Sequence, residues 1–183
     1  MSKRILLLSL MLIAPFSMAG GTVDVALTTE SVRAEHGAVR AGTGIYFTVG
    51  GWYHLDNGGM ASVGAHAVDP NNTRPELVAG LGGKAFLFRP KDQNTTVAIG
   101  LGGFARYQPV DLRGFGAELA GYYAPPVLSF ASLNQFFDLQ ARVTYQVIPQ
   151  GAVFLGYNLT EADYDSPRVR LDNAFTLGFR VSY

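Results

Sequence analysis

The sequence predicts an all-β protein, a transmembrane antiparallel up-and-down β-barrel, because three observations agree. An apolar segment near the start has the form of a removable export signal. Most later segments alternate apolar and other residues with a period of two, the signature of a strand with two different faces. The sequence ends in such a segment, whose final residue is aromatic. We expect eight strands, with ten as the alternative.

The composition fits one β-rich domain in contact with an apolar phase. The 183 residues are 48% hydrophobic and 15% charged, whereas an average soluble domain is about 25% charged. The formal net charge is zero, so no basic excess attracts nucleic acid. There is no cysteine, which excludes a disulfide framework, a thiolate metal site and a lipid-anchored cysteine.

Residues 1–19 have the layout of a secretory signal peptide. A basic pair precedes the apolar run 5–13, and small residues stand three and one positions before a cleavage point after Ala19. The run is shorter than the ~17–25 residues that a spanning helix needs. We therefore expect cleavage near Ala19 and a barrel domain of residues 20–183, located in the bacterial outer membrane.

Five segments alternate clearly. In residues 137–147 one face is entirely apolar and the other entirely polar, and residues 153–160 and 174–183 show a similar alternation. In residues 97–102 and 115–123 the second face is mostly small rather than polar. Weaker candidates for strands are residues 22–33, 43–54, 60–68 and 76–88.

These nine segments do not give the even number of strands that a bacterial barrel needs. Either residues 22–33 are not a full strand, which leaves eight, or a short strand lies in residues 127–131, which gives ten. The mature length favours eight. Side chains just fill a barrel of eight strands, whereas ten would leave a narrow, mildly cation-repelling pore.

Charged residues on the polar faces are the candidate functional set. In a barrel of eight strands they are expected to form a paired network that fills the interior. The predicted lumen-facing residues are Lys84, Arg106, Glu118, Asp138, Arg142 and Arg180.

Aromatic residues and the sparse polar faces favour a membrane barrel over a soluble periplasmic β-sandwich binding module, which would also alternate. Aromatic residues near the strand ends predict the girdles that flank a membrane: Tyr53, Phe86, Phe88, Tyr107, Tyr122, Tyr123, Phe136, Phe137 and Tyr183. Two glycine-rich motifs, residues 80–83 and 100–103, predict a shared bend or a thin region of the wall, because neither precedes a helix that would bind phosphate.

The final segment is similar to the C-terminal signal that the bacterial barrel-assembly machinery reads. The residues that carry this similarity are Gly178, Phe179, Val181 and Tyr183. We expect outer-membrane lipid and the assembly machinery as partners, no nucleic acid, and a monomer.

No residue pattern predicts a catalytic, cofactor or metal site. Ser62 and His66 share a strand face but lie about 13 Å apart at ~3.3 Å per residue. His54 stands near a segment end, and His36 is expected in a loop. Residues 161–165 are expected to form a solvated acidic loop. A lipid-modifying barrel enzyme is the alternative from another functional class.

Three stretches resemble the YfaZ family of small bacterial outer-membrane proteins. They are residues 121–130 (GYYAPPVLSF), 141–150 (ARVTYQVIPQ) and 153–157 (VFLGY). The resemblance implies an outer-membrane barrel of undefined activity, with a structural, surface-interaction or narrow pore role. It implies no catalytic residues.

Overall fold

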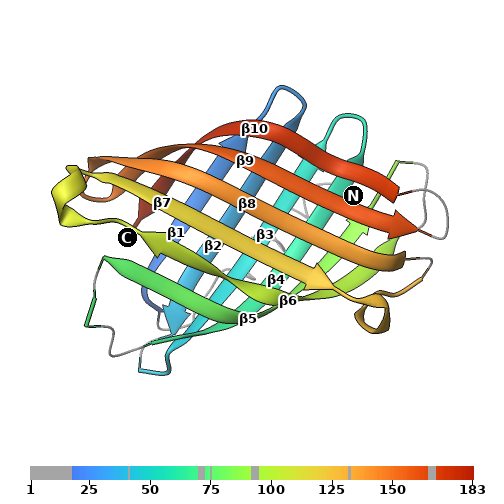
Figure 1. The fold of residues 1–183 in the computed structure, drawn as a ribbon, viewed down its shortest axis with the longest axis horizontal. Helices are drawn as coiled ribbons and strands as arrows, with labels where there is room; N and C mark the ends of the chain where they lie inside the picture. Colours follow the sequence, from blue (N-terminus) through green and yellow to red (C-terminus); the bar gives the residue numbers. More distant parts are fainter. Residues whose placement is uncertain are drawn as a thin grey trace, which may run out of the picture.

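The protein is a closed antiparallel barrel of ten strands (Figure 1). The computed structural model describes residues 18–40, 42–69, 73–74, 76–91, 95–131, 133–164 and 168–183. Each strand pairs with its neighbours along the chain, and β1 pairs with β10 to close the sheet. None of the helices within these ranges is long and apolar enough to cross a membrane.

The strands are ten to sixteen residues long, and two short 3-10 helices lie in connections between them. Their bounds are β1 (Met18–Leu27), β2 (Ser31–Arg40), β3 (Ile45–His54), β4 (Gly58–Val68), β5 (Leu77–Arg89), β6 (Thr96–Tyr107), η1 (Val110–Leu112), β7 (Phe115–Ala124), η2 (Pro126–Leu128), β8 (Leu133–Ile148), β9 (Gly151–Tyr164) and β10 (Arg168–Ser182). The predicted signal segment lies outside the described residues, apart from its last two residues.

The expected count of eight strands is wrong, because residues 22–33 contain a hairpin. The hydroxyl oxygen of Thr28 accepts hydrogen bonds from the backbone N–H groups of Glu30 (3.0 Å) and Ser31 (2.7 Å). The N–H of Thr28 also donates to the carbonyl of Ser31 (2.9 Å), which closes the turn. β2 then continues to Arg40, through a stretch for which no strand was expected.

Residues 127–131 do not supply the tenth strand. They follow Pro126, which opens the 3-10 helix η2, and they make one isolated bridge, between Ser129 and Ala98 of β6. The tenth strand is therefore β2. The acidic stretch that was expected to be a loop is also strand in part, since Glu161 and Asp163 belong to β9.

The barrel carries its charges inside and its hydrophobic residues outside. Along β3 to β7 the exposed side chains are hydrophobic or small, except for Arg89 at the end of β5. Leu81 is 76% exposed, whereas Lys84 on the same strand is 2% exposed. A soluble protein has the opposite distribution, and the closed sheet is not a sandwich.

The two glycine-rich motifs lie directly opposite each other. Gly82 of β5 pairs with Gly102 of β6, and Lys84 pairs with Gly100. A Cβ on Gly82 would lie 2.1 Å from the carbonyl oxygen of Ala65, and one on Gly102 would lie 1.9 Å from that of Gly121. Only glycine allows the neighbouring backbones to come this close.

Replacing either paired glycine with valine is expected to prevent the barrel from folding, because the new side chain would have to displace backbone. Gly83→Ala is the matched control, since a Cβ there meets its nearest atom at 3.5 Å. The measurement is the fraction of refolded protein that migrates as the compact, heat-modifiable form in gels. Normal folding of Gly82→Val would contradict the tight approach.

Four of the nine residues expected in the aromatic girdle lie inside the barrel instead. Phe86, Phe88, Tyr122 and Phe136 are all less than 5% exposed. Phe86 and Phe88 follow Lys84 by two and four residues, so strand alternation places them on the same inward face. Of the residues that were expected in the girdle, Tyr53, Tyr107, Tyr123 and Tyr183 are exposed.

Candidate functional site

Ten charged side chains of the described strands face the interior, five basic and five acidic. The basic residues are Arg33, Lys84, Arg106, Arg142 and Arg180, and the acidic ones are Asp24, Glu35, Glu118, Asp138 and Asp172. Their charges balance. We call this set the ionic network.

Arg180 is the centre of one part of the ionic network. Its Nε donates to Asp24 (2.6 Å), and its Nη2 donates to Glu118 (2.9 Å). Arg142 donates to the other oxygen of Asp24 (2.8 Å). Arg106 lies 4.0 Å from Glu118 and donates to the hydroxyl of Tyr46 (3.2 Å). One acidic residue of β1 is thus joined to β8 and β10.

Asp138 is the centre of a second part. The side chain is fully buried and accepts hydrogen bonds from Arg33 (3.2 Å), Thr160 (2.7 Å) and Gln140 (3.2 Å). Arg33 also lies 3.9 Å from Asp172. Removing Arg33 would leave this buried carboxylate without its paired cation, which is costly in a protein interior.

Lys84 joins the ionic network to aromatic side chains. It forms an ion pair with Glu35, and its ammonium lies 5.3 Å from the centre of the Tyr122 ring. The Tyr122 hydroxyl is 2.8 Å from Nε2 of His66. These contacts connect β2, β4, β5 and β7 across the interior.

An apolar cluster fills the interior near the end of the barrel opposite the start of β1 and the end of β10. The Phe136 ring lies 4.7 Å from that of Phe86 and 5.2 Å from that of Phe88. Trp52 packs in the same cluster and donates from its ring N–H to Asp172 (3.0 Å), which links the cluster to the ionic network. We call this set the apolar plug.

The space left inside is small. A cavity of about 30 Å³ lies among the charged side chains around Arg180 and Lys84, which is room for roughly two water molecules. In the part of the chain that the structure describes, side chains of the ionic network and the apolar plug occupy the interior. Large aromatic side chains of the apolar plug fill the additional width that ten strands give compared with eight.

The structure places all six sequence-predicted residues on the inward face. It brings Arg106, Glu118, Arg142 and Arg180 together around Asp24, whereas Lys84 and Asp138 have separate partners. Sequence reasoning missed Asp24, Arg33, Glu35 and Asp172. The first three belong to the unrecognised β1–β2 hairpin, and alternation within each of its two strands would have pointed to them.

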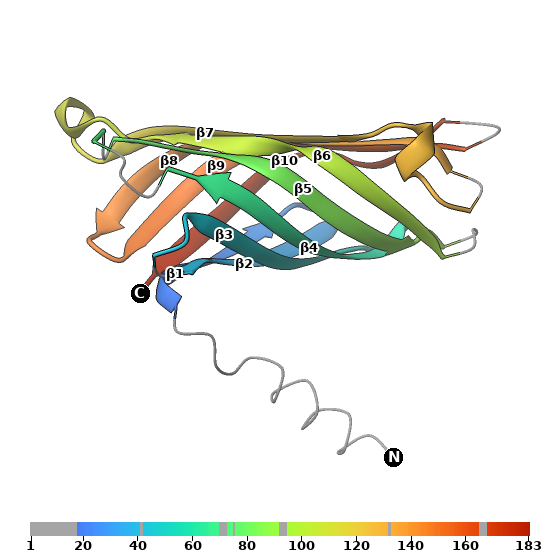
Figure 2. The same cartoon turned by 90° about the horizontal axis from the view of Figure 1, so that it is seen from below.

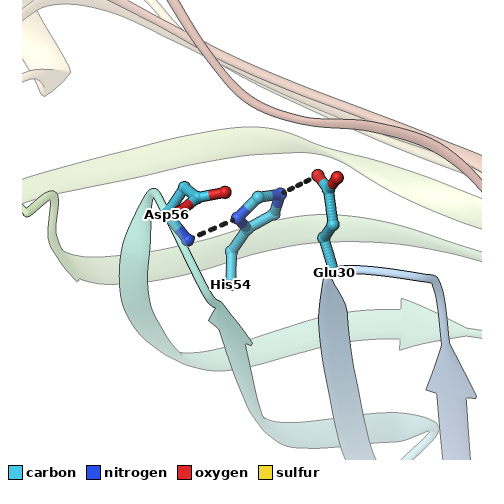
Figure 3. A group of neighbouring side chains, drawn as sticks. All are labelled: Glu30, His54 and Asp56. Atoms are coloured by element: carbon cyan, nitrogen blue, oxygen red, sulfur yellow. Dashed lines mark hydrogen bonds and ion pairs between the residues drawn. The ribbon is translucent and has the colours of Figure 1, made fainter.

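A second group of side chains lies at the barrel rim, where the β1–β2 and β3–β4 turns meet (Figure 3). Ligand-type atoms of Glu30, His54 and Asp56 lie within 4.8 Å of one another. Nδ1 of His54 accepts hydrogen bonds from the backbone N–H groups of Asp56 (3.1 Å) and Asn57 (3.3 Å). Nε2 lies 3.5 Å from the Glu30 carboxylate.

The two hydrogen bonds to Nδ1 of His54 indicate the role of this rim group. Because Nδ1 of His54 accepts, the ring proton of the neutral form is on Nε2, facing Glu30. A histidine that binds a metal ordinarily donates its second N–H to an acceptor, whereas here the second nitrogen faces two donors. The same bonds leave neither ring nitrogen free as a general base. The rim group therefore links two turns.

Adding Zn²⁺ or a chelator is accordingly expected to leave the unfolding midpoint of the barrel in urea unchanged. His54→Ala is expected to lower that midpoint, because it removes the acceptor for two N–H groups, each worth about 1 kcal/mol. The measurement is fluorescence of Trp52, the single tryptophan. Stabilisation by Zn²⁺ that disappears in His54→Ala would contradict this assignment.

Ser62 and the two remaining histidines lie in β4 and β2. Ser62 and His66 both face the interior and are buried, so neither is presented to lipid. His36 lies in β2, not in a loop as expected, and stacks on the ring of Tyr183.

A closed antiparallel barrel with a hydrophobic outer face and a charged interior is the architecture of outer-membrane β-barrels. The chain belongs to the YfaZ family, since the family pattern, described as YfaZ precursor, matches residues 3–182. This confirms the family resemblance seen in the sequence. No curated protein matches the chain in sequence.

Two of the solved structures that match the chain are outer-membrane proteins. The outer membrane protease OmpT from Escherichia coli has a TM-score of 0.53 and 10% sequence identity, over 90% of this chain and 93% of that chain. The outer membrane channel DcaP of Acinetobacter baumannii has a TM-score of 0.46 and 10% identity, over 87% of this chain and 54% of that one. The first supports the barrel architecture and nothing further.

Proposed function

We propose that this protein is an integral outer-membrane barrel with a closed interior, and that its role is structural or surface-interacting rather than transport or catalysis. The observation that carries the proposal is the reversed distribution of side chains. Charges are paired inside, and the exposed wall is hydrophobic.

The hydrophobic wall supports insertion in a lipid bilayer. Phe175 and Leu177 on β10 are 76% and 65% exposed, and water would oppose such exposure of contiguous apolar surface. A closed sheet also leaves no unpaired strand edge in the lipid. Export by residues 1–19, with cleavage near Ala19, and assembly through Gly178, Phe179, Val181 and Tyr183 are parts of the same proposal.

The filled interior supports a closed barrel rather than a narrow pore. The ionic network is neutral as a whole, so it offers no excess charge to select an ion. The apolar plug on one side of it would have to move before ions passed. A lipid-modifying or proteolytic activity has less support, because Ser62 and His66 face inward and the ring nitrogens of His54 are both occupied.

Two measurements test the proposal. Cell fractionation is expected to recover the protein in the outer membrane, with heat-modifiable migration in gels, and recovery in the soluble periplasm would overturn the membrane assignment. Reconstituted into planar bilayers, the protein is expected to give no conductance steps. Reproducible steps from folded protein would overturn the closed interior and leave the membrane assignment intact.

A further inference from the structure

The seam between β1 and β10, where the barrel closes, is shorter than the ladder on the other side of β10. The seam pairs residues from Thr22 with Ser182 to Leu27 with Leu177. The β9–β10 ladder extends from Arg168 to Val181. Fewer backbone pairs hold β10 to β1, so side chains that cross the seam carry more of its stability.

The Tyr183 ring crosses this seam on the outer face. The backbone of Tyr183 exchanges two hydrogen bonds of 3.0 Å with Gly21, so the two residues are directly opposite each other. The ring then reaches over β1 to β2, where it stacks on His36 with a 6.1 Å centroid distance and a 4° interplanar angle. Figure 2 shows the end of β10 beside the start of β1.

Gly21 and His36 are shaped for this ring. A Cβ on Gly21 would lie 2.7 Å from the Tyr183 hydroxyl, so a larger residue would have to displace the ring from its place over β1. Nδ1 of His36 is 3.1 Å from the carbonyl oxygen of Thr22. A carbonyl only accepts, so this nitrogen donates, and Nε2 is left to accept from the Tyr183 hydroxyl at 3.4 Å. The hydrogen bond to Thr22 thus fixes the orientation of the His36 ring independently of Tyr183.

We propose that Gly21 and His36 form a receiving site for the aromatic ring of Tyr183, which fastens β10 to β2 across β1 and holds the barrel closed. The site acts on the outer face. On the inner face of the same seam, Arg180 donates to Asp24, its direct partner in the ladder. The seam is therefore held from both sides. This inference does not depend on whether the interior conducts.

The test is a double-mutant cycle on refolding into lipid vesicles without assembly factors. His36→Ala and Tyr183→Ala are each expected to raise the unfolding rate in urea about two- to tenfold, as loss of one aromatic pair predicts. The double variant is expected to unfold no faster than either single variant. His36→Phe, which retains a stacking ring, is expected to stay close to the unsubstituted protein.

The control is Tyr107→Ala, which removes another exposed tyrosine at the same end of the barrel. Its effect is expected to add to that of His36→Ala. Gly21→Val is expected to mimic Tyr183→Ala, and if it does not fold, the cycle between His36 and Tyr183 still decides the question. Additive effects of His36→Ala and Tyr183→Ala, or equal effects of His36→Phe and His36→Ala, would overturn the proposal.

Discussion

Asp138→Ala is expected to lower the free energy of unfolding by about 3–5 kcal/mol, the cost of breaking a buried ion pair by removing one partner. The variant leaves the Arg33 guanidinium buried with Asp172 at 3.9 Å as its remaining counterion. It also removes the acceptor for Thr160 and Gln140. Urea unfolding in detergent, followed by Trp52 fluorescence, measures the loss, because Trp52 is buried and bonded to Asp172.

Two further variants separate charge from packing at this position. Asp138→Asn keeps the shape and some of the hydrogen bonds, so a smaller loss is expected. The double variant Arg33→Met with Asp138→Leu is expected to recover part of the stability, since replacing a buried pair with apolar side chains of similar size is often neutral, whereas Asp172 loses Arg33 as its cation. Unfolding of Asp138→Ala at the same urea concentration as the unsubstituted protein would show that the pair does not hold the interior.

Which side chains of a strand point into the barrel was predictable from the sequence, because this is a local property. Once a segment is a strand, alternation fixes which residues point inward. This is why Arg142 and Arg180 could be placed inside from residues 137–147 and 174–183 alone. The same rule, applied from Lys84 to Phe86 and Phe88, would have moved two aromatic residues from the expected girdle to the interior.

The number of strands and the ion-pair partners were not predictable. The first depended on a turn without the usual turn residues, and the second depend on closure of the whole barrel. β2 was missed since its turn has no glycine, proline or asparagine and closes instead through the Thr28 hydroxyl. The ion pairs join residues far apart in sequence, such as Asp24 with Arg180 and Arg33 with Asp138. Only closure of the barrel with a definite number of strands brings such residues together.

Arg180→Met is expected to lower the free energy of unfolding by about 3 kcal/mol, because it leaves two carboxylates in a confined interior with fewer donors. Among the described residues, Glu118 then keeps Arg106 at 4.0 Å as its cation, whereas Asp24 keeps Arg142 at 2.8 Å. The measurement is again urea unfolding followed by Trp52 fluorescence. Arg142→Met is the matched control, with a smaller expected loss, since Asp24 then still accepts from Arg180.

A second substitution at Glu118, which Arg180→Met leaves with the more distant cation Arg106, tests whether this carboxylate causes the loss of stability. Adding Glu118→Leu to Arg180→Met is expected to restore part of the stability, whereas adding it to Arg142→Met is expected to cost more, because Arg180 then loses an acceptor. The folded Arg180→Met barrel is also expected to remain silent in planar bilayers, since the apolar plug is untouched. If Arg180→Met conducted and the unsubstituted protein did not, the ionic network by itself would close the barrel, without a contribution from the apolar plug.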